Sequence, residues 1–264
     1  MSVMTKLASL LVSLLASSLA VAAASCAADA TDPPPAVATA VQSEHDARPV
    51  AFPPGAEPLG HDLVQWSQRW WRWIDAQPAD HNPMFDLTGA ECEVGQHGDV
   101  FFLASVADPG GVATIARRCT IPAHEPILVS PGGALNDFPC PDPSFVPAPG
   151  QSLYDFLRLG VAPIVDAVTA MTVSVDGRAV PDPFAYRTTS RHVFTFTGDP
   201  SLAPVFDGCI TGTPQSAVAD GYFMMLHGLD RGTHHLTVRS VDAKGTDVTI
   251  DWALDIAAAQ HGYD

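Results

Sequence analysis

The stretch TDVTIDWALDI, residues 246–256, decides the fold class. Its polar side chains alternate with apolar ones, and the apolar set shares one face: Val248, Ile250, Trp252, Leu254 and Ile256. A strict period of two is typical of a β-strand that buries one face. The sequence therefore predicts that the chain ends in a half-buried strand of a β-rich domain.

Further strand-like segments precede this one. Pro109-Gly110-Gly111 predicts a hairpin turn between the first two, and Asp230 to Gly232 would join the two before residue 246 as a second hairpin. Residues 130–151, rich in proline and glycine, are expected to be a long loop. The predicted strands are 99–106, 114–121, 127–130, 171–175, 193–197, 222–227 and 234–241. This pattern favours a mainly β fold, an antiparallel two-sheet β-sandwich of jelly-roll or Ig-like type with two accessory helices.

The first helix is predicted at WSQRWWRWID, residues 66–75. At 100° per residue, its apolar side chains fall on one arc: Leu63, Val64, Trp66, Trp70, Trp71, Trp73 and Ile74. Asp62 suits the first turn, Pro78 ends the helix, and Asp75 falls on the polar arc. The tryptophans are therefore expected to pack in the core, with ligand contact by Trp73, at the edge of the arc, as the alternative.

A second helix is predicted after Ser152. This serine suits the N-cap position, with Asp155 three residues later. Pro163 lies inside the apolar pattern and is expected to kink or divide the helix, because proline lacks the backbone N–H.

The N-terminal region predicts export from the cytoplasm. Residues 1–25 have the layout of a secretory signal peptide, and Ala23-Ala24-Ser25-Cys26 resembles a bacterial lipobox. Lipid attachment at Cys26 would anchor the protein to a membrane, at the outer membrane or cell surface, and ordinary cleavage would release it. Residues 26–58 are predicted to be a disordered tether rich in alanine and proline, and 59–264 a single domain.

The cysteines agree with an oxidising compartment. There are five in total, so lipid attachment at Cys26 would leave four that can pair completely. We prefer Cys92 with Cys119, which flank the first predicted hairpin, and Cys140 with Cys209, which lie in later loops. Free buried thiols are the alternative.

Charge excludes one class of partner. The 264 residues contain 13 Lys+Arg and 29 Asp+Glu, a formal net charge of −16. Such a chain repels nucleic acid, so DNA or RNA binding is not expected.

No catalytic constellation is evident. The sequence contains neither H-E-x-x-H nor G-x-S-x-G, and no catalytic residue or metal ligand is predicted. The acidic pairs Asp86 with Glu91 and Asp137 with Asp142 could bind calcium in a loop or act as paired carboxylates, which leaves calcium open. Together with other polar side chains, these acids give seven candidates for a functional site: Asp86, Glu91, His97, Asp137, Asp220, His227 and His234.

Several short motifs, in order, carry a resemblance to known sequences. They are Trp70-Trp71-x-Trp73, Asn82-Pro83, Cys92 with Gly95-Gln96, Gly98-x-Val100-x-Phe102-Leu103, Arg118-Cys119-x-Ile121-Pro122-Ala123, Ala219-Asp220-Gly221-Tyr222 and Gly232-x-His234. Together they resemble a group of uncharacterised bacterial secreted proteins and lipoproteins with signal peptides, over residues 64–256. The group usually continues Pro-Ala-Gly-Lys where this chain has Pro122-Ala123-His124-Glu125. The resemblance implies secretion and a shared fold, and it implies no mechanism.

These observations favour a binding or structural component of the bacterial cell envelope, with an unknown ligand. The alternative is a secreted hydrolase with a loop-borne polar or metal site. Convergence of at least three of its candidate residues on one concave pocket would favour the hydrolase: Asp86, Glu91, His97, Asp137 and His227.

Overall fold

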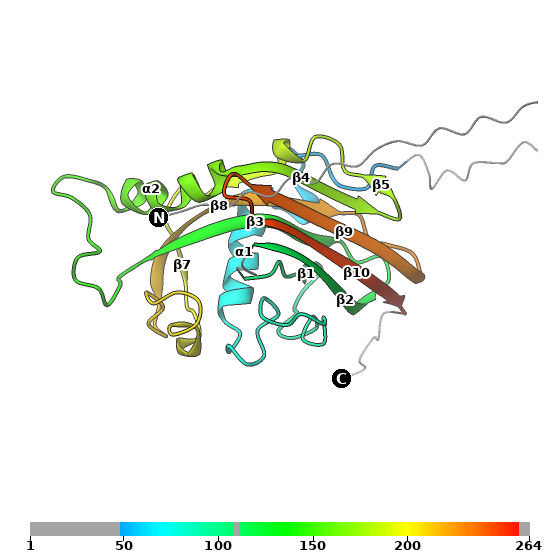
Figure 1. Ribbon diagram of the computed structural model, residues 1–264, viewed down its shortest axis with the longest axis horizontal. Coiled ribbons are helices and arrows are strands. Elements are labelled where there is room, and N and C mark those ends of the chain that lie inside the picture. The colour runs from blue at the N-terminus through cyan, green and yellow to red at the C-terminus, as the bar shows by residue number, and fades with distance from the viewer. Residues whose placement is uncertain (1–47, 108–110, 259–264) are drawn as a thin grey trace, which may run out of the picture. The chain divides into compact units, whose positions relative to one another are not determined.

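Two five-stranded β-sheets form the framework of the protein in a computed structural model that describes residues 48–107 and 111–258 (Figure 1). The first sheet has the order β1 (Phe101–Leu103), β3 (Ile127–Phe138), β8 (Gln215–Leu226) and β6 (Arg187–Thr189), and β7 (Phe194–Phe196) also pairs with β8. The second has the order β2 (Val112–Pro122), β10 (Asp247–Ala257), β9 (Gly232–Asp242), β4 (Val168–Val175) and β5 (Arg178–Ala179). The predicted mainly β fold with two sheets and two helices is confirmed.

The sheets are mixed, so the prediction of purely antiparallel strands was wrong. β1 pairs with β3 in parallel, and β10 pairs with β2 in parallel. The predicted hairpin of 99–106 with 114–121 does not form, because β1 and β2 belong to different sheets. The same holds for β8 and β9, on either side of the turn at Asp230 to Gly232. After β2, the chain returns to the first sheet, and β3 therefore runs parallel to β1.

β10 follows the alternation of its sequence. Ile250, Trp252, Leu254 and Ile256 are buried, whereas Asp251 between them is exposed. The strand is flanked on both sides, by β9 antiparallel and by β2 parallel. Its apolar face therefore lies in the core, as the sequence predicted.

β3 is much longer than the short strand predicted at 127–130. It continues to Phe138 and crosses an irregularity of register between Val129 and Gly132. Pro131 lies at this irregularity, where the missing N–H costs little, because the ladder is already interrupted there. The predicted loop 130–151 therefore begins only after Phe138.

Helix α1 (Leu63–Asp75) begins at the predicted place. Asp62 is the N-cap, its side chain accepts a hydrogen bond from the Gln65 N–H at 2.8 Å, and the Gln65 side chain accepts one from the Asp62 N–H at 3.1 Å. This reciprocal capping box satisfies two N–H groups that the helix itself cannot. The helix contacts β8, β6, β7 and β3, which places it against the first sheet.

Helix α2 (Leu153–Asp166) has the predicted N-cap, because the Ser152 hydroxyl accepts from the Asp155 N–H at 3.1 Å. Pro163 does not divide it. Leu159, whose carbonyl loses its helical donor to this proline, is 61% exposed, so water can solvate that carbonyl. Short 3-10 turns complete the helical content: Pro58–Gly60, Pro183–Tyr186 and Pro200–Leu202.

β8 lies at the centre of the core. Nearly every residue of this strand is buried, and Phe223, Met224, Met225 and Leu226 are each 0% exposed. Burial of both faces explains the continuous apolar run at its end, since a strand with one wet face would alternate. Both helices contact this strand.

The structure describes only part of the N-terminal region. The predicted signal peptide and the predicted lipid attachment at Cys26 lie outside the described residues. The predicted tether ends earlier than residue 58, because Ala51 forms a β-bridge with Leu226 and the Phe52 N–H donates to the Met225 carbonyl at 2.9 Å. Within the described residues, no helix is both long and apolar enough to cross a membrane.

Candidate functional site

The tryptophans of α1 are core residues, as predicted. Trp66, Trp70, Trp71 and Trp73 are between 1% and 6% exposed, and Trp73 is the least buried of the four. Three of the indole N–H groups donate to backbone carbonyls: Trp66 to Pro58 at 3.0 Å, Trp70 to Leu103 at 3.0 Å and Trp73 to Val94 at 2.9 Å. The rings therefore hold the surrounding segments, including the end of β1, against the helix.

A cleft of about 420 Å³ lies beside α1, and we call it the α1 cleft. Three aromatic rings line it, and Trp73 and Trp66 lie with their centroids 5.5 and 6.3 Å from that of Phe102. Its size falls in the range of small-molecule sites. The full lining is Leu59, His61, Trp66, Arg69, Arg72, Trp73, Ala76, Gln77, Gly95, His97, Gly98, Asp99 and Phe102.

Two arginines from the polar arc of α1 reach this cleft. Arg69 lies over the Trp66 ring, with its guanidinium carbon 4.7 Å from the ring centroid, and it hydrogen-bonds His61 at 2.8 Å. Arg72 donates to the Thr195 carbonyl at 2.8 Å. Burial and the neighbouring Arg69 charge lower the pKa of Arg72. Among the described residues, neither arginine forms a salt bridge with a carboxylate, and Asp99 is the one acid among the residues that line the cleft.

The opposite wall of the α1 cleft is a loop held by buried contacts. The Gln96 side chain donates to the carbonyls of Cys92 and Phe102 and accepts from the Phe102 N–H, at 2.8 to 3.0 Å. A disulfide between Cys92 and Cys119 ties the same loop to β2. At Gly95, φ is +65°, and an added Cβ would lie 2.4 Å from the Gln77 side chain. This wall is therefore preorganised.

The structure does not bring the predicted polar candidates together. Of these, His97 is exposed and lines the α1 cleft. Asp86 accepts hydrogen bonds from the N–H groups of Thr88 and Glu91 at 2.7 and 2.9 Å, which closes a local turn. Glu91 contacts His81 at 3.3 Å. Asp86 and Glu91 thus stabilise a loop and do not face a shared pocket with His97.

Asp220 belongs to a buried ion pair. Its carboxylate receives two hydrogen bonds from the Arg187 guanidinium, at 3.0 and 2.6 Å, and a third from Thr189 at 3.0 Å. Asp166, at the end of α2, accepts from the same arginine at 2.7 Å. This arrangement joins β6, β8 and α2, and it leaves Asp220 2% exposed.

His227 and His234 line a second, smaller cleft of about 90 Å³, although their strands belong to different sheets. His234 hydrogen-bonds Asp176 at 2.6 Å through Nδ1, and His227 hydrogen-bonds Arg48 at 2.8 Å. Burial and the Arg48 charge lower the pKa of His227. The histidine partners are an acid and an arginine, so the pair is not arranged as a shared set of metal ligands.

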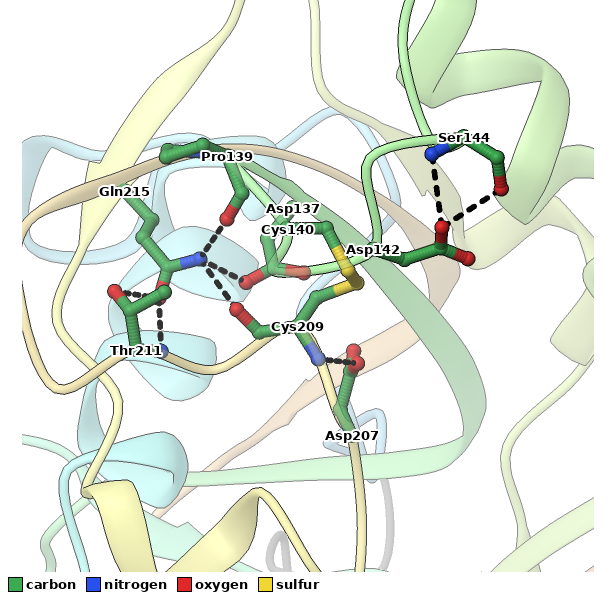
Figure 2. Close-up of a disulfide and its surroundings, with 9 residues drawn as sticks. All are labelled: Asp137, Pro139, Cys140, Asp142, Ser144, Asp207, Cys209, Thr211 and Gln215. Atoms are coloured by element: carbon green, nitrogen blue, oxygen red, sulfur yellow. Dashed lines mark hydrogen bonds between the residues drawn. A yellow bond between two sulfur atoms is a disulfide. The ribbon is translucent and has the colours of Figure 1, made fainter.

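Asp137 is fully buried near the disulfide between Cys140 and Cys209 (Figure 2). The amide nitrogen of Gln215 donates to its Oδ2 at 2.7 Å. Asp142, its predicted partner, is exposed and accepts from Ser144 in the following turn. Asp137 instead lies with Asp207, and sequence reasoning missed both that residue and Asp75.

Both predicted disulfides are present, Cys92 with Cys119 and Cys140 with Cys209. No protein-family model and no curated protein matches the chain. One solved structure, titled "Structure of PbICP-C in complex with falcipain-2", aligns with 61% of this chain and 100% of that chain at 7% identity, with a TM-score of 0.21. A likeness this low carries no argument about this chain, so the function rests on its own geometry.

Proposed function

We propose that the protein is an extracytoplasmic binding protein of the bacterial envelope, and that the α1 cleft is its ligand site. The ligand class that fits is a small organic molecule with an anionic group and a flat or apolar body. The observation that supports this proposal most is the pair of arginines, Arg69 and Arg72, beside aromatic rings in a chain of net charge −16.

Charge and shape both support this ligand class. A guanidinium binds carboxylate or phosphate through two parallel hydrogen bonds, and its geometry favours such planar groups. The rings of Trp66, Trp73 and Phe102 are 5% to 7% exposed, so an apolar body would contact only their small exposed parts. The net negative charge of the chain as a whole would repel an anion, so the two arginines would supply the local attraction.

Binding is better supported than hydrolysis. The five residues that the hydrolase alternative needed are dispersed: His97 lines the α1 cleft, His227 lines the smaller cleft, Asp137 is buried, and Asp86 and Glu91 stabilise a turn. A hydrolytic site needs a nucleophile or activated water held by converging polar groups. This dispersal leaves the hydrolase alternative without a site.

The two disulfides support export, because such bonds persist in oxidising compartments. We propose that Cys26 carries a lipid that anchors the protein to the membrane, with secretion as the alternative. Incorporation of a palmitate analogue tests this. A Cys26→Ala variant that stays in the membrane fraction would refute the anchor.

The architecture proposed for this binding protein is a β-sandwich, and the proposed relatives are the bacterial secreted proteins that share its tryptophan and cysteine motifs. The single buried cluster shared by strands of both sheets supports a sandwich.

Ligand binding is tested by tryptophan fluorescence with a library of small carboxylates and phosphates. Trp66 and Trp73 line the cleft, so an occupant should change their emission. We expect Arg69→Gln to weaken binding of a hit about tenfold, which corresponds to roughly 1.4 kcal/mol. Arg158→Gln removes the same charge from an exposed position on α2 and is the matched control. Equal weakening by both variants would show attraction by net charge alone and would sink the cleft as the site.

A further inference from the structure

Two acidic side chains from distant parts of the chain, Asp137 and Asp207, approach each other closely, and a third, Asp75, is buried at the end of α1. Asp75 is the last residue of α1, Asp137 is near the end of β3, and Asp207 lies in the segment before β8. One carboxylate oxygen of Asp137 and one of Asp207 lie within 4.8 Å of each other and of the Cys209 sulfur. Asp75 is not part of this close group, but burial, and then the charges of Asp137 and Asp207, raise its pKa.

Two of these acids are buried without compensation. Asp75 is 1% exposed, and neither of its carboxylate oxygens has a hydrogen-bond partner. Asp137 is 0% exposed, and its Oδ1 also has none. An unpaired buried carboxylate costs several kcal/mol, on the order of the whole stability of a domain. These oxygens therefore need a proton or a cation.

The end of α1 strengthens the need for positive charge. The helix macrodipole places partial negative charge at its C-terminus, where acidic side chains are unfavourable and cations are favourable. Asp75 occupies that position with its side chain buried. A cation there would offset the helix dipole and the carboxylates together.

The hydrogen-bond acceptors beside Asp137 are oxygens. Gln215 Nε2 lies between Asp137 Oδ2, the Pro139 carbonyl and the Cys209 carbonyl, at 2.7, 2.8 and 2.8 Å (Figure 2). An amide has two hydrogens, so one of these three acceptors is incompletely satisfied. Cys209 is bonded to Cys140 and offers no thiolate. Carboxylates and carbonyls without thiolates suit calcium and disfavour zinc.

We propose that Asp137 and Asp207 bind a divalent cation of the calcium class, with the buried Asp75 carboxylate as a further negative charge in the neighbourhood. Asp207 is half-buried, which gives the cation a route from solvent. Its Oδ1 accepts from the Cys209 N–H at 2.9 Å, so the backbone beside the disulfide orients it. The cation would join β3 and the segment before β8, and it acts independently of the α1 cleft.

The experiment is a calcium titration of the purified protein after treatment with EDTA, at pH 7.5. We expect one calcium ion to bind per chain by calorimetry and the melting temperature to rise by several degrees. Terbium should bind in its place and be sensitised by nearby tryptophans of α1. Binding energy adds to stability by mass action, about 2.7 kcal/mol at a hundredfold excess over Kd.

Matched variants locate the ion. Asp137→Asn and Asp207→Asn should each weaken calcium binding tenfold or more, since each removes a carboxylate charge. Asp142→Asn removes an acid of the same loop that is exposed and bonded only to Ser144, and binding should be unchanged. Circular dichroism of each variant without calcium checks that it folds.

Three results would overturn the proposal. The first is no calcium binding at millimolar concentration, with Asp75→Asn and Asp137→Asn more stable than the parent, because the acids would then be neutral and hold protons. The second is equal loss in Asp142→Asn, which would place the ion on exposed acids. The third is binding retained in both Asp137→Asn and Asp207→Asn.

Discussion

The buried acidic residues of this protein differ in how their charges are neutralised. Asp220 is 2% exposed and receives two hydrogen bonds from Arg187, so its charge is paired. The pKa of Arg187 is raised by its hydrogen bond to Asp220, which reports the same stabilisation from the other side. Asp75 is as deeply buried and has no such partner. Asp220 therefore belongs to a structural ion pair, whereas the Asp75 carboxylate needs a proton or a cation to neutralise it.

Asp220→Asn should destabilise the fold. It removes one charge of a buried pair and leaves Arg187 with an amide, so we expect the free energy of unfolding to fall by about 2 to 4 kcal/mol. The value is below that of a fully buried pair because the Arg187 side chain is 33% exposed. Urea denaturation measures it.

The control for this prediction has the same geometry at the surface. Asp247 receives two hydrogen bonds from Arg239, at 2.9 and 2.8 Å, with the arginine side chain 43% and the acid 30% exposed. Asp247→Asn should cost much less, because water screens the pair. Equal losses in the two variants would contradict the role of burial.

The burial of individual residues could be predicted from the sequence where the elements that bury them are close in the chain. The tryptophans were placed correctly, because the apolar arc of α1 is visible within eight positions. Asp75 was placed on the polar arc, yet it is buried, and the chain near Asp199 packs there, with its N–H donating to the Asp75 carbonyl at 2.7 Å. A helical wheel shows only the residues of the helix itself. It cannot show that a segment more than a hundred residues later in the chain buries one of them.

At the scale of elements, both helices carry side-chain caps. Asp62 and Gln65 form a reciprocal capping box at α1, and Arg191 forms an ion pair with Asp62 at 2.8 Å. The Ser152 hydroxyl caps α2: it accepts from the Asp155 N–H at 3.1 Å and donates to Asp155 Oδ2 at 2.6 Å. The two caps differ in kind, because truncation of Asp62 also removes an ion pair with Arg191.

Asp62→Ala should therefore cost more than Ser152→Ala. We expect a loss of about 1 kcal/mol for Ser152→Ala and about 1 to 2 kcal/mol for Asp62→Ala, from the range measured for N-caps. Thermal and urea unfolding of the two variants give the comparison. A smaller loss for Asp62→Ala would show that the capping box and the Arg191 pair contribute nothing.

Strands were predicted well as segments and poorly as partners. β10, β9, β4 and β7 lie where the sequence pattern placed them, but β5 and β6 were missed. The turns that the sequence predicted at Pro109 to Gly111 and at Asp230 to Gly232 fall between strands of different sheets. A tight turn indicates that the chain changes direction, and it does not say whether the next strand pairs with the last or crosses to the other sheet.

At the scale of the molecule, the two disulfides link segments that local structure does not hold. Cys92–Cys119 ties the wall of the α1 cleft to β2, and Cys140–Cys209 ties the segment after β3 to the segment before β8. The pairing was predicted correctly although the hairpin used to argue for it does not exist. The proposed ligand cleft and the proposed cation site each depend on one of these bonds.

Removing either bond should lower stability, and the longer closed segment should cost more. We expect a loss of about 3 to 5 kcal/mol for each Cys→Ser pair, because an open chain gains entropy when unfolded. The separations are 27 and 69 residues, and loop-closure entropy makes Cys140→Ser with Cys209→Ser worse by about 0.8 kcal/mol.

Denaturation of both double variants and of the reduced parent measures these losses. In EDTA, the difference between the variants should shrink or reverse, because freeing the segment of Asp207 also relieves its repulsion with Asp137, which contributes to the raised pKa of about 7 at Asp137. In calcium, the full entropic difference should return, because a bound cation turns that repulsion into attraction. A difference that is the same in EDTA and in calcium would show that the bond at Cys140 and the acid cluster are energetically independent.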